Sequence, residues 1–153
     1  MTQPPVVGNP ARCPLCSGPG GEILWEDALL RVILADEPAN PGFTRIVWNA
    51  HVAEMTDLRE ADRDRLMAAV WAVEAAMRET LRPDKINLAS LGNVVPHLHW
   101  HVIPRWHDDA QFPQPVWAGV VPGREDAPIR LRERVDQGLV AYRRALAARL
   151  DVA

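Results

Sequence analysis

The segment 97–103 combines residue types and spacing that can support chemistry. It holds three of the chain's five histidines, His97, His99 and His101, in alternation with large apolar residues. Successive side chains of a β-strand point to opposite faces, so the three imidazoles are expected on one face and the apolar residues in a core. Same-face neighbours are roughly 6.5–7 Å apart, so two of them can reach one metal ion or one phosphate. The pattern predicts a strand with a metal site or a phosphate-attacking histidine; the alternative is three structural or surface histidines.

The two cysteines of the chain, Cys13 and Cys16, are a second candidate for chemistry. Their spacing lets both thiolates reach one tetrahedral zinc ion, and two further ligands must then come from elsewhere. His51 and one of the strand histidines can complete a Cys2His2 set. One alternative is a pair of reduced, unligated thiols in a turn. A redox pair is less consistent with the sequence, because the flanks lack the expected strand followed by a helix.

Five strands and two helices are expected to position these residues. The strands are short β-prone runs bounded by turn residues, at 22–25, 29–34, 43–48, 85–91 and 97–105. Apolar residues at intervals of three or four, Leu66, Val70, Val73, Met77 and Leu81, predict a helix over about 57–81. Asp57 and Glu60 are placed for a capping box at its start. A second helix is expected over about 128–150, where Gly138 should cost about 1 kcal/mol relative to alanine.

The order of these elements predicts an α+β domain with a mostly antiparallel sheet, one long central helix and a C-terminal helix. At 153 residues, 48% hydrophobic and 24% charged, the chain suits one domain. We expect a flexible N-terminal arm over 1–12, the main domain over 13–123 and a C-terminal helix over 124–153 that packs on the same domain. The segment 107–123, rich in Pro, Trp and Phe, is expected to be a lid or a packed loop.

Composition argues against several partners. A net charge of −3 gives no basic surface for general nucleic-acid binding. No apolar run approaches the roughly 20 residues of a membrane span, and residues 1–10 lack a signal-peptide core. With two cysteines there is no secreted disulfide framework, so a cytoplasmic protein is expected. Lys85 and Arg105 are expected to be solvated surface cations, with a contribution to phosphate binding as the alternative.

The segment 97–103 resembles the HφHφHφφ signature of the histidine triad (HIT) superfamily, where φ is a large apolar residue. The Cys13-Pro-Leu-Cys16 segment is similar to the CxxC of its zinc-containing members. The glycine-started strand 42–51, which ends in His51, also matches, as do Asn87 and Gly92-Asn93 ahead of the triad. The resemblance covers about 13–105.

The resemblance implies a HIT-like fold and nucleotide chemistry at the α-phosphate. His99 would be the nucleophile that forms a nucleotidyl-histidine intermediate, which water then hydrolyses. His101 would assist it, and Asn87, Gly92 and Asn93 would bind the substrate phosphates. The implied enzyme is a nucleotide phosphoramidase or a dinucleoside polyphosphate hydrolase. Its substrates would be nucleoside phosphoramidates, adenylylated compounds or dinucleoside polyphosphates.

The resemblance also implies a ribose ligand, a zinc ion and an oligomeric state. Asp36 is the nearest match to the family's ribose-binding acidic residue, shifted by about one position. The zinc set is Cys13, Cys16, His51 and His97, which would be structural because four protein ligands leave no open position for water. A homodimer is implied, with a small-molecule nucleotide as the other partner.

Three residues depart from the family pattern. Phe43 stands where the family usually has His, and Val94 stands where a side chain commonly donates a hydrogen bond to the phosphate or leaving group. Pro96, which lacks an N–H, must sit at a strand start or on an edge. Phe43 and Val94 favour an alternative function, a zinc-stabilised nucleotide-binding module with little or no turnover. A further alternative is a catalytic zinc enzyme that uses all three triad histidines as ligands.

Overall fold

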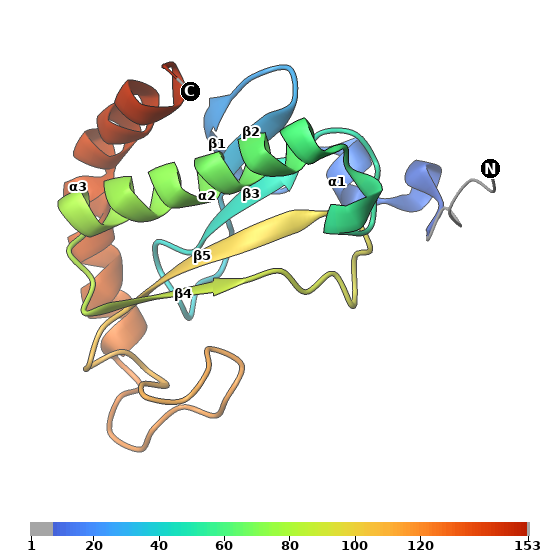
Figure 1. The fold of residues 1–153 in the computed structure, drawn as a ribbon. Coiled ribbons are helices and arrows are strands. Elements are labelled where there is room, and N and C mark those ends of the chain that lie inside the picture. Colours follow the sequence, from blue (N-terminus) through green and yellow to red (C-terminus); the bar gives the residue numbers. More distant parts are fainter. Residues whose placement is uncertain (1–7, 153) are drawn as a thin grey trace.

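The computed structural model describes residues 8–152, which form a five-stranded sheet with two long helices on one face (Figure 1). All neighbouring strands are antiparallel, in the order β1-β2-β3-β5-β4. The strands are β1 (Glu22–Glu26), β2 (Leu30–Leu34), β3 (Thr44–Trp48), β4 (Lys85–Ala89) and β5 (His99–Arg105). The α+β prediction with a mostly antiparallel sheet is confirmed.

Two long helices, α2 (Glu60–Thr80) and α3 (Ala127–Leu150), lie against the sheet and against each other (Figure 1). They confirm the long central helix and the C-terminal helix. Short helical turns precede the strands and α2: η1 (Pro10–Arg12), α1 (Pro14–Ser17) and η2 (Met55–Asp57). Residues 1–7 of the expected N-terminal arm lie outside the described residues, and 10–12 form η1. None of the helices in the described part is long and apolar enough to cross a membrane.

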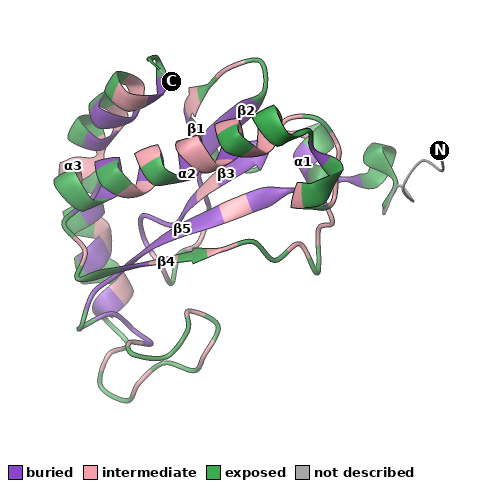
Figure 2. Ribbon diagram, in the orientation of Figure 1, coloured by how far each residue is buried: buried purple, intermediate pink, exposed green. Residues whose placement is uncertain are grey.

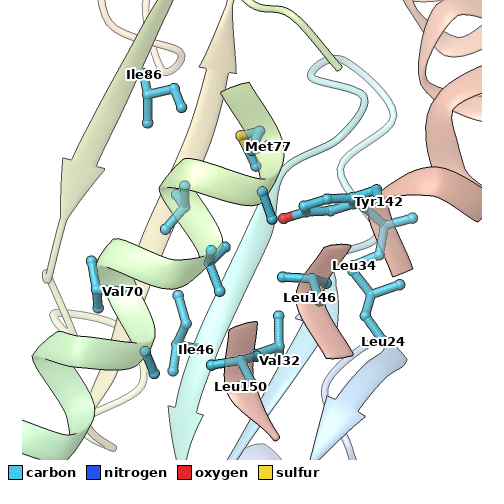
Figure 3. Close-up of a cluster of buried hydrophobic side chains, with 14 of the residues drawn as sticks. Leu24, Val32, Leu34, Ile46, Val70, Met77, Ile86, Tyr142, Leu146 and Leu150 are labelled. Carbon is cyan, nitrogen blue, oxygen red and sulfur yellow. The ribbon is translucent and has the colours of Figure 1, made fainter. Parts of the chain in front are cut away.

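The main core lies between α2, α3 and one face of the sheet (Figures 2 and 3). The apolar stripe of α2 is buried there, and Tyr142 and Leu146 of α3 complete the layer. On β5 the residues between the histidines face this core, because strand side chains alternate. The opposite face of the sheet therefore carries the triad.

The predicted start of the long helix was wrong. Helix α2 begins at Glu60, and Asp57 belongs to the separate turn η2. The Asp57 carboxylate accepts a hydrogen bond from the backbone N–H of Glu54 (3.1 Å), so it caps η2 in place of α2. The capping box expected between Asp57 and Glu60 is therefore formed three residues earlier, between Glu54 and Asp57.

Gly138 has a packing role that its helix propensity does not reveal. It lies on α3 where this helix passes the C-terminal end of α2. A Cβ atom at this position would lie 2.8 Å from Leu81 Cδ2 and 3.3 Å from the Thr80 carbonyl oxygen. The missing side chain lets the two helices approach, which offsets the roughly 1 kcal/mol lost in helix propensity.

A buried hydrogen-bond chain links α3 to the start of β3. The Tyr142 hydroxyl lies 3.0 Å from Thr44 Oγ1, which in turn donates to the Gly42 carbonyl (3.0 Å). Burial raises the pKa of Tyr142 above its usual value, so the phenol stays protonated and donates to Thr44. We expect Tyr142→Phe to lower the free energy of unfolding by about 1 kcal/mol, measured by urea denaturation.

A matched double variant tests this assignment. In Tyr142→Phe/Thr44→Val both partners are apolar. The double variant should therefore lose less unfolding free energy than the sum of the losses in the two single variants. Additive losses, or an unchanged denaturation midpoint in Tyr142→Phe, would show that the bond does not contribute.

Residues 106–123 form a loop without helix or strand that is tied to the end of β5 (Figure 1). Arg105 is only 2% exposed, and its guanidinium donates to both carboxylate oxygens of Asp109 (2.7 and 3.1 Å) and to the Gln114 carbonyl (2.7 Å). The expectation of a solvated Arg105 was therefore wrong, because a carboxylate inside the loop compensates its charge. Burial opposes ionisation of Asp109, but hydrogen bonds from Arg105 and from two loop N–H groups outweigh it and lower the Asp109 pKa.

Asp109→Asn should therefore destabilise the protein by about 3–5 kcal/mol, because it leaves a buried guanidinium without its counter-charge. Thermal unfolding measures the change. Asp108→Asn is the matched control, since Asp108 makes an exposed ion pair with Arg130 (2.8 Å). Equal effects of the two substitutions would contradict the structural role given to Asp109.

Candidate active site and metal site

Four candidate metal ligands converge at one end of the sheet. Cys13 is the N-cap of α1 and Cys16 lies within this helix. His51 follows β3, and His97 lies two residues before β5. One potential ligand atom from each lies within 4.8 Å of all the others. The strand expected from His97 begins only at His99, because Leu98 already donates its N–H to Val52 (2.7 Å), beyond the end of β3.

The distances fit one tetrahedral ion. His97 Nδ1 lies 3.3 Å from Cys13 Sγ, 3.4 Å from Cys16 Sγ and 3.3 Å from His51 Nδ1. Zinc bonds of about 2.3 Å to sulfur and about 2.0–2.1 Å to nitrogen give tetrahedral edges of about 3.6 Å (S–N) and about 3.3 Å (N–N). The observed sulfur–nitrogen distances are only slightly shorter, so the four side chains suit zinc in type and in spacing.

The protonation state of His97 agrees with a ligand role. Its Nε2–H donates to the Trp48 carbonyl (2.6 Å), which leaves the lone pair of Nδ1 directed at the thiols. Burial lowers the His97 pKa and keeps the imidazole neutral, as a metal ligand must be. His99 and His101 do not belong to any group of candidate metal ligands within the described residues. This geometry does not support a single metal site shared by all three triad histidines.

His99 is presented as a neutral base with one ring nitrogen free. Its Nδ1–H donates to the backbone carbonyl of His97 (2.5 Å), so the lone pair is on Nε2. Nε2 has no hydrogen bond within the described part of the chain, and the side chain lines a cavity. Burial, followed by the charge of Arg45, lowers the His99 pKa. A neutral imidazole with a free Nε2 is a competent nucleophile near pH 7.

His101 lies beside His99 on the same face, with the ring centroids 4.9 Å apart. Arg45, directly opposite His101 on β3, donates its Nε–H to His101 Nδ1 (3.4 Å). The proton of His101 is therefore on Nε2. Burial, with smaller contributions from His99 and Arg45, lowers the His101 pKa to about 4. His101 is thus a neutral hydrogen-bond donor at physiological pH.

The lowered pKa of His101 predicts a specific acid sensitivity. The His101 imidazole takes up a proton near pH 6.5 in the unfolded chain but only near pH 4 in the folded chain. The stability that the neutral His101 contributes is therefore fully present above pH 6.5 and is lost as the pH falls towards 4. Between pH 7.5 and 5, wild type should lose roughly 1–2 kcal/mol more unfolding free energy than His101→Gln. Urea denaturation of both proteins at the two pH values measures the difference, and an equal loss in both contradicts it.

The triad cavity has a volume of about 590 Å³. It is bounded by α1, the triad strand, the segment 91–95 and the loop residue Trp117. Its lining residues are Pro14, Leu15, Gly20, Arg45, Leu91, Gly92, Asn93, Val94, Val95, His99, His101 and Trp117. Trp117, which is 69% exposed, also lines a neighbouring cavity of about 390 Å³. The two hollows therefore meet at this side chain.

The structure brings together some predicted substrate ligands and separates others. Gly92, with a φ of +74°, and Asn93 line the cavity with the triad. Asn87 lines the neighbouring cavity, where its Oδ1 accepts a hydrogen bond from Arg105 (2.9 Å). Asp36 is exposed and lines neither hollow.

Arg45 is a site residue that sequence reasoning did not assign to the substrate cavity. Arg45 is two residues from Phe43, so strand alternation puts both on one face. Arg45 reaches the triad because β3 lies beside β5. The residue pattern of a single strand does not indicate which strand is its neighbour. Trp117 belongs to the segment 107–123, for which the sequence left a lid and a packed loop open, and it lines the triad cavity.

Comparison with known proteins agrees with this geometry. The model of the HIT domain family matches residues 20–108. The AP-4-A phosphorylase of Mycobacterium tuberculosis is 30% identical over 105 residues, which is 65% of this chain and 54% of that protein. An uncharacterised HIT-like protein of Saccharolobus solfataricus is 29% identical over 94 residues, 58% of this chain and 68% of that protein. The chain thus spans about half the length of the phosphorylase.

Solved structures show the same fold. A histidine triad protein from Bradyrhizobium japonicum superposes with a TM-score of 0.68 at 31% identity, over 84% of this chain and 92% of that one. A zinc-bound histidine triad protein from Mycobacterium smegmatis superposes with a TM-score of 0.57 at 24% identity, over 87% of this chain and 99% of that one. At this identity the likeness concerns the fold alone. The resemblance predicted from the triad segment is confirmed. The chain belongs to the HIT domain family.

Proposed function

We propose that this protein is a nucleotide hydrolase or transferase that acts at an α-phosphate through a nucleotidyl intermediate on His99. The observation that carries the proposal is the arrangement of His99, whose Nδ1–H is held by the His97 carbonyl while Nε2 faces the cavity. Membership of the HIT family and the similarity to an AP-4-A phosphorylase support nucleotide chemistry. The candidate substrates are nucleoside phosphoramidates, adenylylated compounds and dinucleoside polyphosphates.

The proposed reaction has two steps. His99 Nε2 attacks the α-phosphorus, the P–N bond forms, and the bond from phosphorus to the leaving group breaks. Water then attacks the same phosphorus, the P–N bond breaks, and the nucleoside monophosphate leaves. Negative charge on the phosphoryl oxygens requires fixed donors, which His101 Nε2–H, the Asn93 amide and the N–H of Gly92 can supply.

The other proposed ligands need movement or an exposed substrate. Asn87 is committed to Arg105 in the neighbouring cavity, so it would bind the part of a substrate that passes Trp117. Asp36 is at the surface beyond β2, where only a ribose at the mouth of the site can reach it. Both stay proposals for substrate binding.

We also propose a structural zinc ion held by Cys13, Cys16, His51 and His97. The spacing of the four ligand atoms and the single free nitrogen of His97 support it. Bound zinc would link α1 to the ends of β3 and β5. With four protein ligands it would leave no coordination position for a reacting water.

A covalent-trapping experiment tests the proposed function. The protein is mixed with adenosine 5′-phosphoramidate or with diadenosine tetraphosphate, quenched in alkali, and digested for mass spectrometry. Release of AMP and an adenylyl group on the His99 peptide are expected. Hydrolysis without any adduct, together with unchanged activity in His99→Ala, would exclude the nucleophile assignment.

The second candidate function is a zinc-stabilised nucleotide-binding module with little turnover. Val94 favours it, because this side chain is 93% exposed at the cavity rim and cannot donate a hydrogen bond. Calorimetry with AMP separates the two functions. Binding of AMP without hydrolysis of either adenylyl substrate would support the module.

A homodimer is a further proposal from the family resemblance. Strand β4 is at the edge of the sheet, paired on one side only by β5, and its Leu88 is exposed. An unpaired strand edge with an apolar side chain is a surface on which another strand can pair. Light scattering coupled to gel filtration measures the mass, and a monomer across the working concentrations would exclude the dimer.

A further inference from the structure

We propose that Arg45 selects substrates whose leaving group is an anionic phosphate chain, as in a dinucleoside polyphosphate, over substrates that release an amine. The inference rests on the proposed function, in which His99 attacks an α-phosphorus. It assigns Arg45 as a specificity-determining residue and, of the three substrate classes, favours the dinucleoside polyphosphates over the phosphoramidates.

The first support is the charge of the cavity. Arg45 is the only lysine or arginine among its lining residues in the described chain, and none of these residues is acidic. The other lining side chains are apolar or neutral. A phosphate chain that extends from the phosphorus at His99 would therefore meet a single fixed cation.

The second support is the way in which Arg45 is held. Its Nη2 donates to Glu37 Oε1 (2.6 Å), and its guanidinium carbon lies 5.3 Å from the centroid of the Phe43 ring. With the Nε contact to His101, these partners fix the plane of the guanidinium. Nη1 has no hydrogen bond within the described residues, and the side chain keeps 23% of its surface exposed. A preorganised donor is thus available in the cavity without rearrangement.

The third support is the effect of Arg45 on His101. A guanidinium remains protonated in proteins, so its Nε–H always donates. His101 Nδ1 must accept, and His101 cannot become an imidazolium while this contact persists. The titratable and charged groups that face His101 are His99 on its own strand and Arg45 on β3, with Glu37 behind Arg45. His101 is therefore held as a neutral donor.

These features favour one leaving group over the other. When His99 Nε2 attacks a polyphosphate, the bond from the α-phosphorus to the bridging oxygen breaks and the electron pair stays on that oxygen. The product is a nucleoside polyphosphate anion that needs no proton near pH 7 and is stabilised by Arg45. When a phosphoramidate reacts, the departing nitrogen must gain a proton as its bond to phosphorus breaks. A neutral His101 could supply it only by becoming an imidazolate, so this reaction is disfavoured.

The test compares two substrates that form the same adenylyl-His99 intermediate. Diadenosine tetraphosphate releases ATP in the first step, and adenosine 5′-phosphoramidate releases ammonia. We expect wild type to have a kcat/KM about 100-fold higher for the polyphosphate. In Arg45→Gln that value should fall by about 30-fold or more, whereas the value for the phosphoramidate should change by less than about threefold.

Three further readouts separate selectivity from a structural effect. Arg45→Lys keeps the charge without the planar Nε–H donor and should recover part of the polyphosphate activity. In Arg45→Gln the acid limb of the pH–rate profile should move to higher pH, because a positive charge beside His101 is removed. Arg149→Gln is the matched control, since Arg149 pairs with Glu79 between α3 and α2 (2.5 Å). This variant should leave kcat/KM unchanged for both substrates.

An equal fall in kcat/KM for both substrates in Arg45→Gln, or a wild-type preference for the phosphoramidate, would overturn the inference. Failure of the proposed function is visible separately, as the absence of an adenylyl-His99 adduct with either substrate. If Arg45→Gln does not fold, Glu37→Gln replaces it. That variant keeps the cation without its counter-charge and should raise the preference for the polyphosphate, and a lowered preference would contradict the proposal.

Discussion

His99→Ala is expected to lower kcat for adenylyl substrates by at least about 10³-fold and to eliminate the covalent adduct. The reason is that His99 lines the cavity with an unprotonated ring nitrogen that has no partner among the described residues, while His97 faces the thiols and the unprotonated nitrogen of His101 accepts from Arg45. Steady-state release of AMP and intact-protein mass spectrometry under alkaline quench measure the two effects.

His107→Ala is the matched control for this loss. His107 is an exposed histidine that pairs with Asp84 (3.3 Å) and lines neither hollow at the triad. It should retain the wild-type rate. Retention of more than about a tenth of the activity in His99→Ala, with a normal unfolding temperature, would assign the nucleophile to another group.

Cys13→Ala is expected to remove bound zinc and to lower the unfolding temperature by more than about 10 °C. The four ligands come from three separate segments, so the ion would close two long loops of the chain at once. Elemental analysis of the purified protein should give one zinc per chain in wild type, and calorimetry with and without a chelator should reproduce the shift.

Ser17→Ala tests whether the loss depends on the thiol. Ser17 is in the short helix that Cys13 caps and is exposed, with its hydroxyl directed at the Pro14 carbonyl (3.5 Å). It should keep both zinc and stability. A wild-type protein without zinc, or a Cys13→Ala variant with an unchanged zinc content, would exclude the proposed metal site.

Local patterns predicted the elements well because each pattern reflects one local cause. Alternation along 99–105 follows from the pleat of a strand that has a core on one side. The stripe from Leu66 to Met77 follows from the helical period. These causes act within one segment, so the strands and helices were found with small errors at their ends.

The neighbours of each strand could not be predicted in the same way. Arg45 meets His101 only because β3 and β5 are adjacent and in register, although 56 residues separate the two positions. Arg105 was taken for a surface cation because nothing near it in the sequence indicates burial. Its partner Asp109 comes from a loop that has no periodic pattern.

The attachment of the 106–123 loop determines how substrates reach the triad. Arg105 binds the first half of the loop, and Arg124 donates to the Asp109 and Phe112 carbonyls (3.1 and 2.8 Å), so both ends are anchored. A lid that swings open would have to break these buried charged contacts. Entry is therefore expected across the segment 91–95, whose residues also line the cavity. The rate of product release should then depend on the backbone freedom of this segment, and Gly92, at a φ of +74°, is the residue whose replacement would slow it.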